Sequence, residues 1–101
     1  MLTLPIKKKW FDMILSGEKK EEYREMTPYY QVRFKNLWKF DQFNGSAIRE
    51  IRFQNGYSGD SPSFVAKCTL KTSTGKVEWG AEPGKKYYIL KIHEISDRRM
   101  S

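Results

Sequence analysis

The sequence contains little of what disulfide-rich or metal-binding domains need, because its 101 residues include one cysteine and one histidine. Cys68 has no partner for an internal disulfide, and Cys68 and His93 cannot supply the four ligands of a zinc cluster. We therefore expect no metal and no cofactor. No apolar run approaches the roughly 20 residues of a membrane-spanning helix, and residues 1–5 lack the basic start of a signal peptide. These absences predict a cytoplasmic protein without a membrane partner.

The composition is that of one small folded domain covering residues 1–101. Hydrophobic residues make up 39% and aromatic residues 15% of the chain, which is enough for a small core. Lys and Arg number 19 against 12 Asp and Glu, so the formal net charge is +7. A charge of this size attracts polyanions such as nucleic acid, although many small domains carry a similar charge for solubility alone.

Hydrophobic periodicity predicts an α+β domain of five to six strands with two helices in the N-terminal half. The helices are expected at residues 7–16 and 28–40, the first ended by Gly17 and the second capped by Thr27 with Pro28 at its first position. Strands are expected at residues 2–6, 19–26, 48–54, 64–72, 77–79 and 87–95, with loops at 41–46, 55–62 and 81–86.

Two of these strands carry more specific predictions. Residues 74–75 read as a turn that pairs strands 64–72 and 77–79 as a hairpin. Strand 87–95 has apolar residues on both of its faces, as expected of a central strand covered on both sides. Such a set of strands favours a partly closed β-barrel.

Residues 18–25 concentrate seven charges in eight positions, between two apolar helical patterns. A solvated edge strand would explain this run, because charges on edge strands block aggregation between sheets. Glu22 and Arg24, however, lie two residues apart and project to the same face, where they can pair. Arg presents a planar fork suited to phosphate or to a base edge, and Glu accepts from an amino group. Lys19, just beyond the predicted helix cap, adds a point charge.

This part of the sequence resembles the opening signature of ASCH domains, which belong to the PUA-like superfamily. The resemblance rests on Leu4-Pro5-Ile6, on Phe11, and on the spacing Gly-x-Lys-x-x-Glu-x-Arg over residues 17–24. Residues 52–57, 78–80 and 88–95 add weaker matches, so that the resemblance covers nearly the whole chain. It implies a small, partly closed β-barrel whose basic cleft, at the first helix–strand junction, binds RNA or a nucleotide-like ligand. Lys19, Glu22 and Arg24 would line that cleft.

The resemblance also leaves an enzyme open as an alternative, namely a small hydrolase that acts on RNA or on an N-acylated nucleoside. One branch of the family resembles an amidohydrolase with a lysine after the capping glycine and a threonine three positions later. Here Lys19 is kept, but Glu22 replaces the threonine and can serve only as a base. Glu78 is the nearest available carboxylate in the expected architecture for the further acidic residue of that branch. Lys19 and Glu22 are thus the catalytic candidates if the protein is an enzyme.

Three further residues are candidates for contacts with a ligand. Asn55 offers an amide that can read a base edge, and Tyr57 offers a ring for stacking, unless the loop is an ordinary turn. Trp79, beside Gly80, can present a ring face to a base, unless it fills the core. Trp10 and Trp38 lie in helical stripes and are expected in the core. His93 is expected to be either a solvent-facing histidine or an edge histidine with a hydrogen-bond partner.

Overall fold

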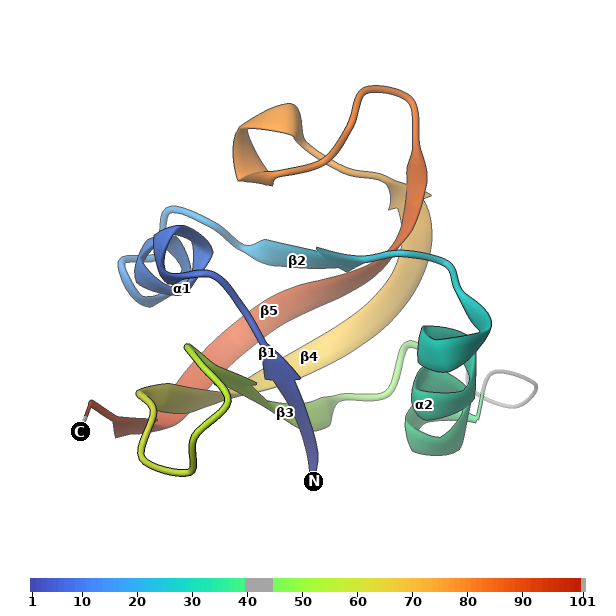
Figure 1. Ribbon diagram of the computed structural model, residues 1–101. Coiled ribbons are helices and arrows are strands. Elements are labelled where there is room, and N and C mark those ends of the chain that lie inside the picture. The colour runs from blue at the N-terminus through green and yellow to red at the C-terminus, as the bar shows by residue number, and fades with distance from the viewer. Residues whose placement is uncertain (40–44, 101) are drawn as a thin grey trace.

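The computed structural model describes residues 1–39 and 45–100 (Figure 1). Its elements are β1 (Leu2–Pro5), α1 (Lys8–Leu15), β2 (Glu21–Arg24), α2 (Pro28–Trp38), β3 (Arg49–Gln54), β4 (Ser63–Thr74), a short 3₁₀ helix η1 (Val77–Trp79) and β5 (Lys86–Arg99). The α+β class with two helices is confirmed. Among the described residues, neither helix is long and apolar enough to cross a membrane.

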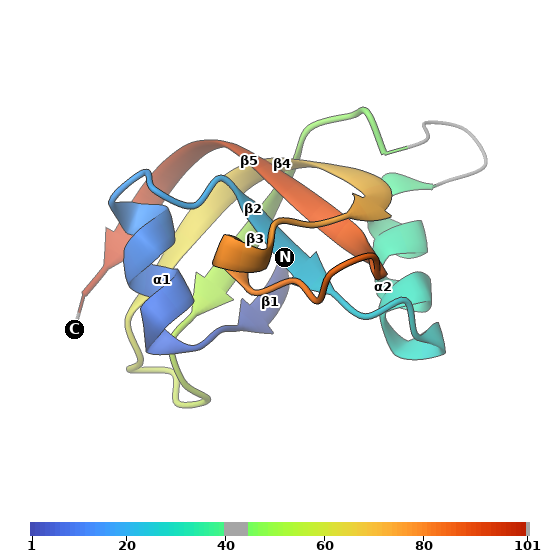
Figure 2. The same cartoon turned by 90° about the horizontal axis from the view of Figure 1, so that it is seen from above.

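Five strands form one mixed sheet in the order β1-β3-β4-β5-β2. β1 pairs with β3 in parallel, and every other pair is antiparallel. The long strands β4 and β5 bend strongly along their length (Figures 1 and 2). Within the described residues, β1 and β2 do not pair with each other, so strand pairing leaves the sheet open between its two edges.

The helix boundaries follow local signals in the sequence. In α2 the Thr27 side chain accepts a hydrogen bond from the Tyr30 backbone N–H, and Pro28 begins the helix. Lys39 adopts a left-handed conformation directly after the last helical residue. The predicted end at Phe40 and most of the predicted loop 41–46 lie outside the described residues. α1 is followed by Gly17, whose φ of 84° suits glycine.

The core consists of two clusters on opposite faces of β5. Tyr88 and Leu90 pack into the larger cluster with Phe34 and Trp38 of α2, whereas Tyr87 and Ile89 join the smaller one. All four of these β5 residues are buried. The prediction of a central strand covered on both faces is therefore confirmed, with β5 lying between β4 and β2.

The predicted strand at residues 77–79 is wrong, and so is the hairpin that it was expected to form. These residues form η1, in which the Gly80 N–H donates to the Val77 carbonyl and Gly80 has a φ of 103°. Instead, β4 continues to Thr74 and pairs antiparallel with β5 from Lys86 onward, and η1 lies in the connection between these two neighbouring strands. β5 also extends beyond the predicted Ile95 to Arg99.

Candidate functional site

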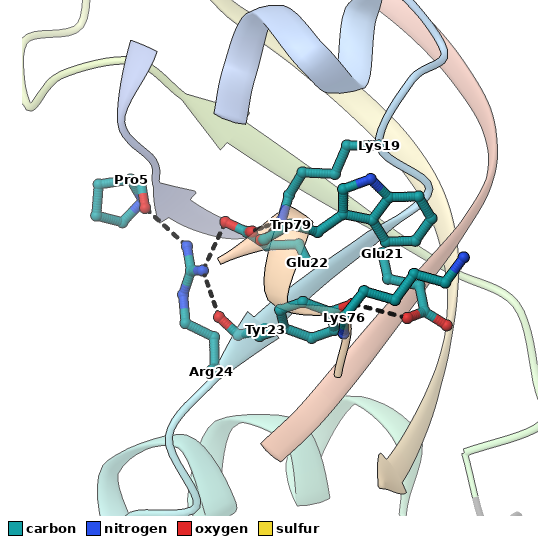
Figure 3. A network of polar contacts seen from close by, with 8 residues as sticks. All are labelled: Pro5, Lys19, Glu21, Glu22, Tyr23, Arg24, Lys76 and Trp79. Atoms are coloured by element: carbon teal, nitrogen blue, oxygen red, sulfur yellow. Dashed lines mark hydrogen bonds and ion pairs between the residues drawn. The ribbon is translucent and has the colours of Figure 1, made fainter. Parts of the chain in front are cut away.

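The structure brings together the three charged residues that the sequence singled out (Figure 3). Lys19 follows α1, while Glu22 and Arg24 belong to β2. Lys19 Nζ lies 2.8 Å from Glu22 Oε1, and Arg24 Nη1 lies 2.7 Å from Glu22 Oε2. Each oxygen of the Glu22 carboxylate thus accepts a hydrogen bond from a different cation, and the cluster carries a net charge of +1.

Burial distinguishes this cluster from an ordinary charged edge. β2 does lie at an edge of the sheet, but Lys19 is only 1% exposed and Glu22 only 4%. The solvated-edge interpretation is therefore wrong for these two residues. Buried ions need partners, and Lys19 Nζ also donates to the Trp79 carbonyl at 2.8 Å. The same ammonium lies 4.9 Å from the ring centroids of both Trp10 and Tyr23.

Burial also lowers the pKa of Lys19 below its ordinary value of 10.5, because the charged ammonium loses its hydration. Glu22 opposes this shift through its charge and its hydrogen bond, and the nearby Arg24 adds to it. Burial raises the pKa of the neighbouring Tyr23 phenol as well. Tyr23 therefore stays a neutral hydroxyl that donates to Glu21 and accepts from the Lys76 backbone N–H.

Arg24 links the two open edges of the sheet. Its Nη2 donates to the Pro5 carbonyl of β1 at 2.7 Å, and its Nη1 donates to Glu22 and to the Tyr23 carbonyl (Figure 3). Side-chain contacts thus join β1 to β2 where backbone pairing does not. Within the described residues, these hydrogen bonds use three of the five guanidinium N–H groups.

A pocket of about 200 Å³ lies beside this cluster, and we call it the tryptophan pocket. Its lining residues are Pro5, Ile6, Lys7, Trp10, Glu22, Tyr23, Arg24, Trp79 and Gly80. Trp10 comes from α1 and Trp79 from η1, which lies close to β2 in both ribbon views (Figures 1 and 2). The lining of the pocket therefore combines three aromatic residues, Trp10, Tyr23 and Trp79, with a carboxylate and a guanidinium.

Trp10 is one of the lining residues that the sequence analysis did not assign to a site. It was expected in the core, yet it is half-buried, whereas its neighbour Phe11 is 2% exposed. Adjacent helical residues point about 100° apart, so Trp10 and Phe11 cannot both face the sheet. That adjacency was the available signal. Gly80 has no side chain and therefore allows η1 to lie close to Trp10. A Cβ at this position would lie only 2.9 Å from the indole ring.

A second and larger hollow, of about 440 Å³, adjoins the tryptophan pocket. We call it the tyrosine hollow; it is lined by Pro5, Ile6, Lys7, Tyr30, Gly56 and Tyr57. Tyr57 is 91% exposed, as a ligand-stacking residue would be. Asn55 lines neither cavity, since its side-chain amide donates to the Ile6 carbonyl and holds the loop to the end of β1.

The remaining candidates lie outside the two cavities. Glu78 is exposed on η1 and lines neither of them. His93 is exposed on β5, as predicted, and its Nε2 lies 2.9 Å from Thr69 Oγ1. Among residues 1–39 and 45–100, no group of three or more Cys, His, Asp or Glu side chains could hold a metal ion.

No family model, curated protein or solved structure matches the chain. The resemblance to ASCH domains consequently rests on the sequence motifs given above.

Proposed function

We propose that the chain is an ASCH-type, PUA-like domain that binds RNA or a nucleotide-like ligand in the tryptophan pocket. The observation that carries this proposal is the position of the buried Lys19–Glu22–Arg24 cluster beside two partly exposed indole rings. Flat aromatic rings stack on nucleobases of any sequence. Arg24 can donate to a base carbonyl or a phosphate, and Glu22 can accept from a base amino group.

Two features of the fold support the PUA-like part of the proposal. The five-stranded sheet is mixed and strongly bent, and the Arg24–Pro5 contact joins its two edges. In a partly closed barrel such as that of PUA-like domains, the two edge strands must lie near each other, as β1 and β2 do at this contact. Arg24 is therefore both a site residue and the residue that joins the two edges of the sheet.

The contacts of Lys19 favour binding over hydrolysis. Lys19 does not line the tryptophan pocket, and its ammonium is directed at Glu22 and at the Trp79 carbonyl. A nucleophile or proton donor must reach the substrate, and Lys19 does not reach the space a substrate would occupy. We therefore assign Lys19 a positioning role, in which it fixes the Glu22 carboxylate and η1.

The experiment is a titration with short single-stranded RNA and with a panel of nucleosides that includes an N-acylated cytidine. Quenching of tryptophan fluorescence is the readout, because Trp10 and Trp79 line the pocket whereas Trp38 is fully buried. Arg24→Gln and Trp79→Ala should each weaken binding about tenfold, the size of one charged hydrogen bond or one stacked base. Lys67→Gln is the matched control, since it removes one charge from an exposed pair with Glu94 on the β4–β5 surface.

Both variants are first checked by circular dichroism and urea unfolding, so that lost binding is not confused with lost folding. Wild-type affinity in both folded variants, or no binding of any probe to the wild type, contradicts the proposal. The same mixtures are analysed by chromatography for products. Turnover that disappears in Glu22→Gln would replace binding with the hydrolase alternative.

A further inference from the structure

The tryptophan pocket is small for a complete nucleotide. Its volume of about 200 Å³ is below the roughly 300–1,000 Å³ of typical small-molecule sites. It has room for one ring system against Trp10 or Trp79, and the sugar and phosphate must then lie outside it. The ligand therefore continues across the protein surface from the mouth of the pocket.

The tyrosine hollow provides a surface for that continuation. It shares Pro5, Ile6 and Lys7 with the tryptophan pocket, so these three residues form the wall between the two cavities. Beyond the wall stands Tyr57, whose side chain makes no hydrogen bond or ring contact with the described residues. An aromatic side chain that is 91% exposed and borders a hollow offers a free face to a second base.

Lys7 supplies the charge between the two aromatic positions. It is exposed, it lies directly before α1, and it lines both cavities. Among the described residues Lys7 forms no ion pair, so its ammonium is available to an anion. A phosphate that links two nucleosides would carry its charge near the wall on which Lys7 lies.

We infer that the ligand is a single-stranded oligonucleotide of at least two nucleotides. One base occupies the tryptophan pocket, the linking phosphate contacts Lys7, and the second base stacks on Tyr57. Two separate aromatic positions require bases that are splayed apart, which a duplex does not offer. This inference rests on the proposed function and specifies the ligand class of the same site.

The test measures the affinity of the protein for three probes: adenosine 3′-monophosphate, the dinucleotide ApA and the corresponding DNA dinucleotide. ApA contains one more nucleoside than the monophosphate. ApA should bind about tenfold more tightly than the monophosphate, the effect of one stacked base. Tyr57→Ala should abolish this gain and leave the affinity for the monophosphate unchanged. Val32→Ala, which truncates a 55% exposed side chain of α2 that lines neither cavity, should change neither affinity.

With a longer single-stranded RNA, Lys7→Gln should reduce the magnitude of the slope of log affinity against log salt by about 0.7, the value for one phosphate contact. Equal affinity for the monophosphate and ApA, or a gain that survives in Tyr57→Ala, would overturn the inference while the proposed function stands. Failure of the monophosphate, ApA and longer RNA alike to bind would instead refute the proposed function. The DNA dinucleotide decides whether the site depends on the 2′-hydroxyl.

Discussion

Replacing Glu22 with Gln tests whether the buried charges hold the fold together. The substitution keeps the shape of the side chain but leaves the Lys19 ammonium, 1% exposed, without its counter-charge. Removing one partner of a buried ion pair costs about 3–5 kcal/mol, and the retained amide oxygen of Gln favours the lower end, about 3 kcal/mol. Domains of this kind have total stabilities of about 5–15 kcal/mol, so the variant should fold but unfold at a lower urea concentration.

The loss in stability should depend on pH in a defined direction. Burial already lowers the pKa of folded Lys19 below 10.5, and Glu22 partly restores it, so Glu22→Gln lowers that pKa further. At a pH below the pKa of Lys19 in the folded variant, Lys19 is protonated in both the folded and unfolded states, and Glu22→Gln causes its full loss of unfolding free energy. As the pH rises toward 10.5, the folded variant releases its proton before the unfolded chain does, and the penalty falls. The difference from wild type should therefore shrink between pH 7 and pH 10.5.

The assay is urea unfolding at pH 7 and at alkaline pH, followed by tryptophan fluorescence and circular dichroism. Asp12→Asn is the matched control, because it breaks the exposed Lys8–Asp12 pair of 2.6 Å, which contributes about 0.5 kcal/mol at most. In a Lys19→Met, Glu22→Gln double variant, the loss should be smaller than in Glu22→Gln alone. The reasoning is refuted if Glu22→Gln costs no more than Asp12→Asn, or if its penalty persists unchanged at alkaline pH.

Two further predictions concern residues outside the two cavities, Cys68 and Gly75. Burial raises the pKa of the Cys68 thiol to about 12, so iodoacetamide at pH 8 should not label the native protein but should label the protein unfolded in urea. Rapid labelling of the native protein would contradict the burial of this thiol. Gly75→Ala should destabilise the protein by about 1–3 kcal/mol, because the new Cβ would lie 2.6 Å from Tyr23 Cζ. An unchanged midpoint of urea unfolding would contradict this prediction, because it would show that the Tyr23 ring moves aside without cost.

The parts of the fold that were predicted correctly are those with local signals. Thr27 and Pro28 determine the start of α2 within a few residues of sequence, and Gly17 determines where the chain leaves α1. The apolar residues on both faces of the predicted strand 87–95 similarly predict that both faces of β5 are covered, as the two core clusters confirm. The prediction of 77–79 as a strand failed because Val77 and Trp79 are typical strand residues, whereas the chain here forms η1. This turn ends at the left-handed Gly80, which lies close to Trp10 of α1.

The candidate site shows the same division between local and distant information. The pairing of Glu22 with Arg24 follows from their spacing along one strand. The burial of Lys19 does not, because it depends on the Trp79 carbonyl, which is 60 residues further along the chain. The placement of Trp10 in the pocket likewise depends on where η1 lies. Sequence patterns therefore identified the charges of the site and one of its two indole side chains, Trp79, but not Trp10.

The role of Arg24 explains why stability and binding are difficult to separate at this site. Its guanidinium joins Glu22 to the Pro5 carbonyl, and thereby β2 to β1, so its removal loosens the sheet edges and the pocket together. Tyr57 is different, because it lies outside the core and no described contact depends on it. A loss of affinity in Arg24→Gln thus combines structural and direct effects, whereas a loss in Tyr57→Ala reports ligand contact alone. Tyr57 therefore gives the cleaner test of whether this surface binds a nucleic acid.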